Sequence, residues 1–425
     1  MGPRLTLAIL VLLTGCSDHG ASTRPDVASP SASPAATTQT TATTQSAEHR
    51  GEPDRTTPAE RWAEPPVSHL LAVHHDDTRA SARTTAVELA TPGPVAGDER
   101  SWPALPLERW PGHFTFPASH DGGPHYAVAR PDGERFSLVW AAVGDAAADR
   151  TVDLGPRAPA ALLVAGTHVL AGIDNIVGEA DFEPPVPTFR ELHTRPEMPR
   201  GKAYDLLTRT GDWVIAIDDI VMPIYADGLR LGPGGRARHE VGFELPGAIN
   251  GTYRYAALHR TGPDTGVLYA IVSYGIMDGS GQDLARLPVE GGRTTSGFEL
   301  ILNSGGHPNV LEEHVDRGTG KPTALTAGST FTPWTGLALL EDPAGLRHVL
   351  LAAGARGLLV LDPEVGPTTK AETIELGGPC YDVRAVGARV FALVEGAVVE
   401  LHTVDGHLRE HARASMPAGF AQWAR

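Results

Sequence analysis

The C-terminal part of the chain contains a run of short apolar strands and two-residue turns, and it constrains the fold more than any other stretch. Within residues 379–416, strands are predicted at 381–386, 390–394, 398–404 and 408–414. The turns between them are Gly387-Ala388, Glu395-Gly396 and Asp405-Gly406. Glycine reaches positive φ without steric cost, which two-residue hairpins need. The first three strands are apolar and the fourth is half charged, so this segment predicts a meander that runs from buried to exposed.

Similar pairs of apolar strands recur through the chain. Their first strands begin near residues 126, 160, 204, 255, 337 and 381. These starts lie about 34, 44, 51, 82 and 44 residues apart, and periods in the forties are typical of β-propellers. The longest interval is nearly two units, so residues 298–326 are predicted to hold a degenerate blade. Strands at 69–73 and 85–89 either start the ring or supply the strand that closes it.

The sequence therefore predicts an all-β fold over residues 67–425. We expect a single β-propeller of about seven four-stranded blades, with six or eight allowed. A pair of two-sheet sandwiches is the main alternative, but it needs no repeat near 44 residues. The proline-rich residues 91–111 are predicted to form a loop that crosses to the next blade.

Third strands of these units carry a family resemblance. Residues 357–362, Gly-Leu-Leu-Val-Leu-Asp, resemble the G-L-x-V-x-D third strand of quinoprotein-like and WD-repeat-like bacterial propeller repeats. Residues 398–402 occupy the same place in the last unit. The resemblance implies an architecture and implies no reaction.

The N-terminus reads as an export and anchoring signal. Arg4 precedes the apolar run 5–13, which is too short to span a bilayer. Leu13-Thr14-Gly15-Cys16 then resembles the lipobox of a bacterial lipoprotein. The resemblance implies a signal peptide over residues 1–15 and acylation of Cys16, which would anchor the exported protein to the bacterial cell membrane or outer membrane. An ordinary secretory peptide with a chance cysteine is the alternative.

A tether is predicted between this cysteine and the folded domain. Residues 16–66 are rich in Ser, Thr, Ala and Pro and almost lack large apolar side chains. Such a segment buries too little surface to offset its ordering entropy, so we expect a disordered linker.

Charge and motifs exclude several classes of function. The net charge of −16 argues against nucleic-acid binding, which needs clustered Lys and Arg. The sequence contains no G-x-S-x-G, no G-x-x-x-x-G-K-[ST] and no H-E-x-x-H motif. With Cys16 lipidated, Cys380 has no partner for a disulfide and is predicted to be a small buried side chain.

Candidate site residues follow from the expected ring. Loops that enter inner strands and loops that join second to third strands converge on one mouth of the channel. The first set brings His120, Asp121, His125, Lys202, Asn250, Trp334 and Cys380. The second set brings Asp174, Asn175, Asp218, Asp219, Tyr274, Asp278, Arg356 and Glu395.

These residues support two interpretations. Converging carboxylates and histidines suit a divalent cation, because hard ions prefer oxygen ligands and Zn²⁺ accepts His with Asp. The other interpretation is structural, because most of these residue types also occur as turn formers, loop residues or core side chains.

The favoured hypothesis is a membrane-anchored propeller that binds or scaffolds at the cell envelope, with no cofactor and with an envelope protein or glycan as its ligand. The alternative is a propeller enzyme with a metal-assisted hydrolase or lactonase site at the channel mouth. A third possibility is a subunit of an envelope assembly.

Overall fold

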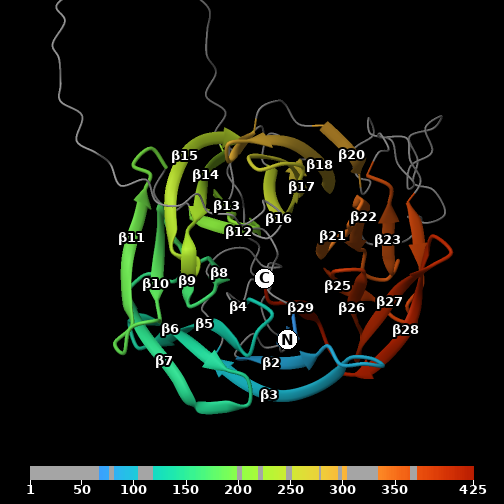
Figure 1. The fold of residues 1–425 in the computed structure, drawn as a ribbon, viewed down its shortest axis with the longest axis horizontal. Coiled ribbons are helices and arrows are strands. Elements are labelled where there is room, and N and C mark those ends of the chain that lie inside the picture. The colour runs from blue at the N-terminus through green and yellow to red at the C-terminus, as the bar shows by residue number, and fades with distance from the viewer. Residues whose placement is uncertain are drawn as a thin grey trace, which may run out of the picture. The chain divides into compact units, whose positions relative to one another are not determined.

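The chain forms a seven-bladed β-propeller (Figure 1). The structure is a computed structural model, and it describes residues 67–75, 81–103, 118–198, 203–218, 224–245, 251–276, 279–294, 299–303, 334–363 and 371–425. Within these residues the regular elements are antiparallel strands and one short 3₁₀ turn, η1 (Pro233–Gly235). The all-β prediction and the predicted number of blades are therefore confirmed.

Blades 2 to 4 are each built from four consecutive strands, ordered from the channel outward. Blade 2 contains β4 (Ala118–His120), β5 (His125–Asp132), β6 (Arg135–Ala142) and β7 (Asp145–Gly155). Blade 3 contains β8 (Ala161–Ala165), β9 (His168–Ile173), β10 (Ile176–Asp181) and β11 (Thr188–Thr194). Blade 4 contains β12 (Tyr204–Thr210), β13 (Trp213–Asp218), β14 (Ile224–Leu231) and β15 (Ala237–Leu245).

Blades 5 to 7 continue the same order. Blade 5 contains β16 (Gly251–Arg260), β17 (Thr265–Ile276), β18 (Gly279–Glu290), β19 (Arg293–Thr294) and β20 (Glu299–Asn303), which also pairs with β18. Blade 6 contains β21 (Gly336–Asp342), β22 (Gly345–Ala352), β23 (Leu358–Leu361) and β24 (Glu372–Ile374). Blade 7 contains β25 (Cys380–Val386), β26 (Arg389–Val394), β27 (Ala397–Val404) and β28 (His407–Ser415).

Blade 1 joins the two ends of the described chain. It combines β1 (His69–His75), β2 (Ser81–Glu88) and β3 (Val95–Pro103) with the innermost strand β29 (Ala421–Trp423). The register places Ala72 opposite Trp423 and His74 opposite Ala421. The N-terminal strands therefore start the ring, and the closing strand comes from the C-terminus.

The core is divided into seven apolar clusters, and each cluster lies between two neighbouring blades. The cluster between blades 7 and 1 joins Leu70 and Trp423 to Phe391 and Leu393. When both faces of a sheet are buried against neighbouring blades, the sequences of its middle strands are nearly continuous runs of apolar residues. Strand β26 is an example. In blade 7 burial fades from β26 to the mostly exposed β28, as the sequence predicts.

Several strand assignments need correction. The strand expected to be innermost at 126 is the second strand of its blade, β5, because the three-residue β4 precedes it. Residues 91–111 are not wholly a loop, because β3 forms the outer strand of blade 1, where an edge position tolerates Pro103. The described part of 298–326 belongs to blade 5 through β20, and the remainder lies outside the described residues.

Two ends of the ring are distinguished by the strand connections. We call face A the end that carries the connections between first and second strands and between third and fourth strands. Face B carries the connections between second and third strands and the segments that enter each first strand. Antiparallel strands alternate in direction, so every blade follows this assignment.

Ring closure yields the first prediction. Replacing Trp423 with Ala should lower the free energy of unfolding by about 3–5 kcal/mol, because the buried indole packs between blades 7 and 1. The change also removes the hydrogen bond from Nε1 to the Phe391 carbonyl (3.1 Å). Urea denaturation followed by far-ultraviolet circular dichroism measures the loss.

The matched control is Val186→Ala, since Val186 is 74% exposed. We expect that variant to stay within about 0.5 kcal/mol of the parent protein. A Trp423→Ala variant as stable as this control would contradict the proposed role of β29 in closing the ring.

Candidate functional site

The channel wall is lined on one side by the C-terminal segment of the chain. Figure 1 shows the C-terminus at the centre of the ring. Gln422 Nε2 donates to the Tyr255 hydroxyl of blade 5 (2.5 Å) and to the Thr335 carbonyl beside blade 6 (3.3 Å). Arg425 Nη1 donates to the Leu337 carbonyl (2.7 Å). Polar groups of the inner strands are therefore engaged by the chain itself.

Asp382 is the buried anchor for this segment. Its Oδ2 accepts the Trp423 N–H (2.8 Å), and its Oδ1 accepts from the Val383 N–H (2.8 Å) and from the Arg425 guanidinium. Burial raises the pKa of Asp382, and the Arg425 charge opposes that effect. The closing strand is therefore held by a charged pair as well as by apolar packing.

His120, Asp121 and His125 lie in the β4–β5 turn on face A, away from the mouth where the sequence placed them. His120 is buried, its Nε2 donates to the Gly123 carbonyl (2.9 Å), and its Nδ1 accepts the Gly122 N–H (3.2 Å). Asp121 Oδ1 accepts the Gly123 N–H (2.9 Å), and the His125 ring stacks on Trp140 with centroids 5.3 Å apart. Both ring nitrogens of His120 are occupied, so it holds the turn.

Asp174, Asp218 and Glu395 lie at second-to-third strand connections on face B, as predicted. Asp174 has φ 48° and pairs with Arg157 at 3.4 Å. Asp218 Oδ1 accepts the Tyr225 N–H (2.9 Å), and Glu395 Oε1 accepts the Gly419 N–H (2.9 Å). Each carboxylate therefore bonds within or next to its own blade.

The other predicted residues divide into three groups. Trp334 and Cys380 are core side chains, and burial raises the pKa of the Cys380 thiol. Asn175 Nδ2 donates to the Arg195 carbonyl (3.1 Å), Arg356 lies in the β22–β23 connection, and Tyr274 belongs to β17. Lys202, Asp219, Asn250 and Asp278 lie outside the described residues, as does Cys16.

Two groups of three potential metal ligands occur among the described residues, and neither contains a residue singled out by sequence. The first group lies on the outer strand of blade 3 and the third and outer strands of blade 4. The second lies in blade 3, on its second and third strands and the connection that follows. The first group is His193, Asp227 and His239, and the second is His168, Asp181 and Glu183. In each group the ligand atoms lie within 4.8 Å of one another.

The first group is a closed hydrogen-bond network. Asp227 is fully buried, and its Oδ1 lies 2.9 Å from His239 Nε2, 2.9 Å from Arg195 Nη2 and 3.4 Å from His193 Nε2. The Tyr204 hydroxyl donates to Oδ2. The two imidazole rings stack with centroids 3.8 Å apart and an interplanar angle of 2°. Burial is the main cause that lowers the pKa of His193.

Arg195 makes this network a clamp between blades. It comes after β11 of blade 3, and it donates to the Ala226 and Phe243 carbonyls of blade 4 at 3.2 Å each. A side chain at Gly242 would meet Arg195 Nη2 at 2.0 Å, so glycine is required for this approach. The guanidinium neutralises the one carboxylate that a metal ion would need here.

The second group is less fully bonded. His168 is 2% exposed, and its Nδ1 makes no hydrogen bond within the described structure. The nearest carboxylate oxygens are Glu179 Oε1 at 3.6 Å and Asp181 Oδ1 at 4.0 Å. The sequence pattern could have indicated this second group, because the acidic residues Glu179 and Asp181 interrupt the otherwise apolar strand β10.

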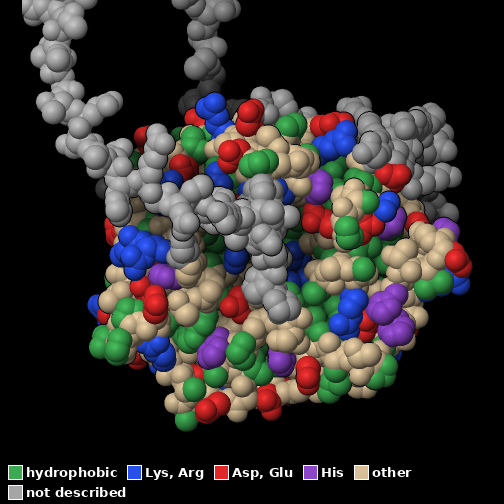
Figure 2. All heavy atoms as spheres, viewed as in Figure 1, with side chains coloured by type: hydrophobic (Ala, Val, Ile, Leu, Met, Phe, Trp, Pro, Cys, Tyr) green, Lys and Arg blue, Asp and Glu red, His purple; other side chains and the backbone are tan. Residues whose placement is uncertain are grey.

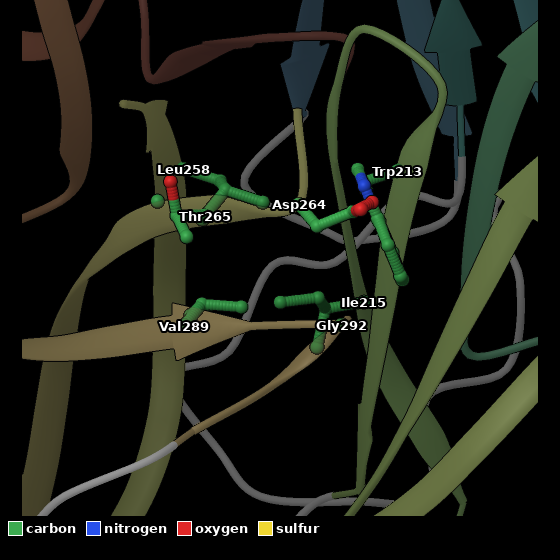
Figure 3. Close-up of a pocket in the computed structure, with 8 residues that line it drawn as sticks. Trp213, Ile215, Leu258, Asp264, Thr265, Val289 and Gly292 are labelled. Atoms are coloured by element: carbon green, nitrogen blue, oxygen red, sulfur yellow. The ribbon is translucent and has the colours of Figure 1, made fainter. Parts of the chain in front are cut away.

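A shallow pocket lies between blades 4 and 5 on face A, and Figure 3 shows the residues that line it. The space among these residues is about 240 Å³ with open solvent included, and little of it is enclosed. The Arg230 guanidinium lies 3.8 Å from the centroid of the Trp213 ring, and a side chain at Gly292 would meet that ring at 2.0 Å. This pocket is the packing site of Trp213 rather than room for a large ligand.

Comparisons with known proteins identify the fold and no family. No protein-family model matches the sequence, and no curated protein matches it. A solved structure of a protein from Lactobacillus plantarum is similar with TM-score 0.50 and 11% identity, covering 84% of this chain and 99% of that one.

Two further solved structures match with lower TM-scores. AztD from Citrobacter koseri has TM-score 0.42 and 9% identity over 83% of this chain and 88% of that one. BamB from Moraxella catarrhalis has TM-score 0.36 and 14% identity over 70% and 75%. In the part of the chain that the structure describes, no helix is long and apolar enough to cross a bilayer.

His120 yields a prediction about pH. Burial, with the nearby Arg384 charge, lowers the pKa of His120 to about 3 from 6.5. The unfolded chain therefore binds this proton first, and stability is lost as the pH falls from about 6.5 towards 3. His120 should account for about 2 kcal/mol of lost unfolding free energy between pH 7 and pH 5.

Urea denaturation at both pH values tests this expectation. His120→Gln should remove that part of the pH dependence, although it also lowers stability at pH 7 by breaking the turn. His407→Gln, at a residue whose side chain is 58% exposed, is the control and should retain the parental dependence. An unchanged dependence in His120→Gln would show that other groups cause the acid sensitivity.

Proposed function

We propose that this protein is an exported lipoprotein whose propeller serves as a binding or scaffolding module at the cell envelope. The anchor is Cys16, acylated after removal of residues 1–15. The tether is residues 16–66, and the module is residues 67–425. The ligand is an envelope protein or glycan.

The sequence around Cys16 supports the anchor. A basic residue, a short apolar run, a small-residue pair and a cysteine follow one another in the order that lipidation signals use. Several acyl chains on one cysteine hold a protein stably to a membrane surface, whereas a single chain binds marginally. The protein would thus reach its ligand from the membrane surface.

The engagement of the channel wall supports binding on an outer surface of the ring. Gln422, Arg425 and Asp382 use their polar groups to fix the closing strand. The pocket beside Trp213 is small, so a ligand would contact a broad face or the perimeter. Figure 2 shows acidic, basic and histidine side chains interspersed over the described atoms of one face, a surface suited to a polar macromolecular partner.

The metal-assisted hydrolase or lactonase at the channel mouth has less support. Of the residues suggested for it, His120 and His125 lie on face A, whereas Asp174, Asp218 and Glu395 lie on face B. All five already make hydrogen bonds, ion pairs or ring contacts with neighbours.

Lipidation is tested by replacing Cys16 with Ser. The variant should move from the membrane fraction to the soluble fraction after export and lose incorporation of labelled palmitate. Cys380→Ala is the control, because its thiol is buried in the propeller core, and it should stay with the membrane. Membrane association of the Cys16→Ser protein equal to that of the parent would contradict the anchor.

Binding is tested with the full-length Cys16→Ser protein, which is expected to be soluble. Immobilised protein should bind solubilised envelope components saturably, and bound components are identified by mass spectrometry. The same protein, denatured in urea before immobilisation, is the control for a lost fold. Binding that is non-saturable, or that survives the loss of the fold, would contradict a role for the propeller surface.

A further inference from the structure

A ring nitrogen of the buried His168 makes no hydrogen bond, although carboxylates lie close to it. His168 opens β9 and is 2% exposed, and its Nδ1 is enclosed without a hydrogen bond in the described structure. A buried nitrogen without a partner costs about 1–3 kcal/mol, so such an atom needs an explanation.

Carboxylates surround this nitrogen on the next strand and in the turn after it. His168 and Asp181 are direct partners in the β9–β10 hairpin, and Glu183 follows two residues later. Ligand atoms of His168, Asp181 and Glu183 lie within 4.8 Å of one another. Glu179, fully buried on the same strand, adds an oxygen 3.6 Å from His168 Nδ1.

The distances are wrong for a simple ion pair. A protonated imidazole would donate to a carboxylate at about 2.7–2.9 Å. The observed separations of 3.6 and 4.0 Å are longer. The 4.0 Å separation between His168 Nδ1 and Asp181 Oδ1 instead suits two ligands of one ion, because zinc lies about 2.0–2.2 Å from each His nitrogen or carboxylate oxygen. Asp181 Oδ1 also accepts the Glu183 N–H (2.9 Å), which fixes the direction of the carboxylate.

The local charge also favours a cation. Glu179, Asp181 and Glu183 supply three carboxylates against the guanidinium groups of Arg190 and Arg236. Arg190 pairs with Oε2 of Glu179, and Arg236 lies 3.3 Å from Oδ2 of Asp181 with its side chain 62% exposed. Arg150, the other nearby cation, donates to the carbonyls of Phe182 and Pro184 rather than to a carboxylate.

We propose that His168, Asp181 and Glu183 bind a divalent transition-metal ion of the zinc or manganese type. His168 Nδ1 supplies the nitrogen ligand, and Asp181 and Glu183 supply oxygen. Glu179 stays bonded to the Ala237 N–H (2.6 Å) and adds negative potential behind the site. The exposed Glu183 gives the ion its path from solvent.

The neighbouring triad is the natural comparison. There, Asp227 Oδ1 already accepts from Arg195 and from His239 at 2.9 Å each. An ion would have to displace a buried guanidinium that also binds two carbonyls of blade 4. His193, Asp227 and His239 therefore stay a structural network, although their residue types look more like a zinc site.

The inferred site lies within blade 3, next to blade 4, and is independent of the envelope role proposed above. The Ala237 N–H and Arg236 of blade 4 approach Glu179 and Asp181 of blade 3. An ion that is bound by His168, Asp181 and Glu183 only in the folded state would stabilise the folded propeller by mass action.

The test uses untagged, full-length Cys16→Ser protein, freed of metal with a chelator. Titration with ZnCl₂ and separately with MnCl₂, followed by calorimetry, should show one equivalent bound per chain. Asp181→Asn and Glu183→Gln should each weaken the affinity tenfold or more. Co²⁺ bound in place of Zn²⁺ should give a visible spectrum that shows nitrogen coordination and that changes in His168→Asn.

The matched control is His239→Gln in the neighbouring triad, which should keep the parental affinity. Glu183 is exposed, so Glu183→Gln is expected to fold and keeps the test decisive even if a buried variant does not. Absence of stoichiometric binding by either ion would overturn the proposal. Affinity unchanged in Glu183→Gln, or lost in His239→Gln, would equally overturn it.

Discussion

Every blade buries both of its faces, and the rest of the architecture follows from that requirement. The apolar clusters lie between successive blades all the way around, so no blade has a face without a neighbour among the described residues. An open row of such sheets would expose an apolar face at each end. Closing the ring removes both exposed ends, and here three residues of β29 complete the sheet that does so. An ion pair between the fully buried Asp382 and the partly exposed Arg425 holds that strand, and loss of Arg425 would leave the buried carboxylate without its counter-charge.

The parts of the fold that sequence predicted are those with local causes. In blade 7, Gly387, Gly396 and Gly406 adopt the positive φ that the turns need, and a strand begins within two residues of each. The misassigned parts are strands too short to show a pattern. β4 and β29 have three residues each, too few for an alternation pattern. β29 is a strand because it pairs with β1 at the other end of the described chain, whereas β4 pairs with β5, the next strand. Because the sequence analysis took β5 as the first strand of blade 2, it predicted His120 and His125 at the opposite end of the ring from where they lie.

The two polar clusters were harder to predict than the fold, because the residues of each come from different strands and those of the triad come from two blades. Asp227 and His239 belong to adjacent strands of blade 4, and His193 comes from blade 3. The sequence analysis selected polar residues in loops. In the structure, Asp174 pairs with Arg157 and Asp218 accepts the Tyr225 N–H, so both bond locally. The usable signal was a polar residue inside an apolar strand, as at Glu179 in β10, since such a carboxylate must have a buried partner.

Four of the six buried carboxylates in the described residues follow one pattern. Each of four lies against an arginine, in the pairs Glu179 with Arg190, Asp227 with Arg195, Asp382 with Arg425, and Glu400 with Arg389. That pairing neutralises these four acids. Of the two other buried carboxylates, Asp218 accepts the Tyr225 N–H and Asp181 lies 3.3 Å from the exposed Arg236. His168 Nδ1 differs from these groups, because it is buried without a hydrogen bond and the nearest oxygens, those of Glu179 and Asp181, are too far away to accept one. A divalent cation bound by His168, Asp181 and Glu183, as proposed above, would give that nitrogen a partner.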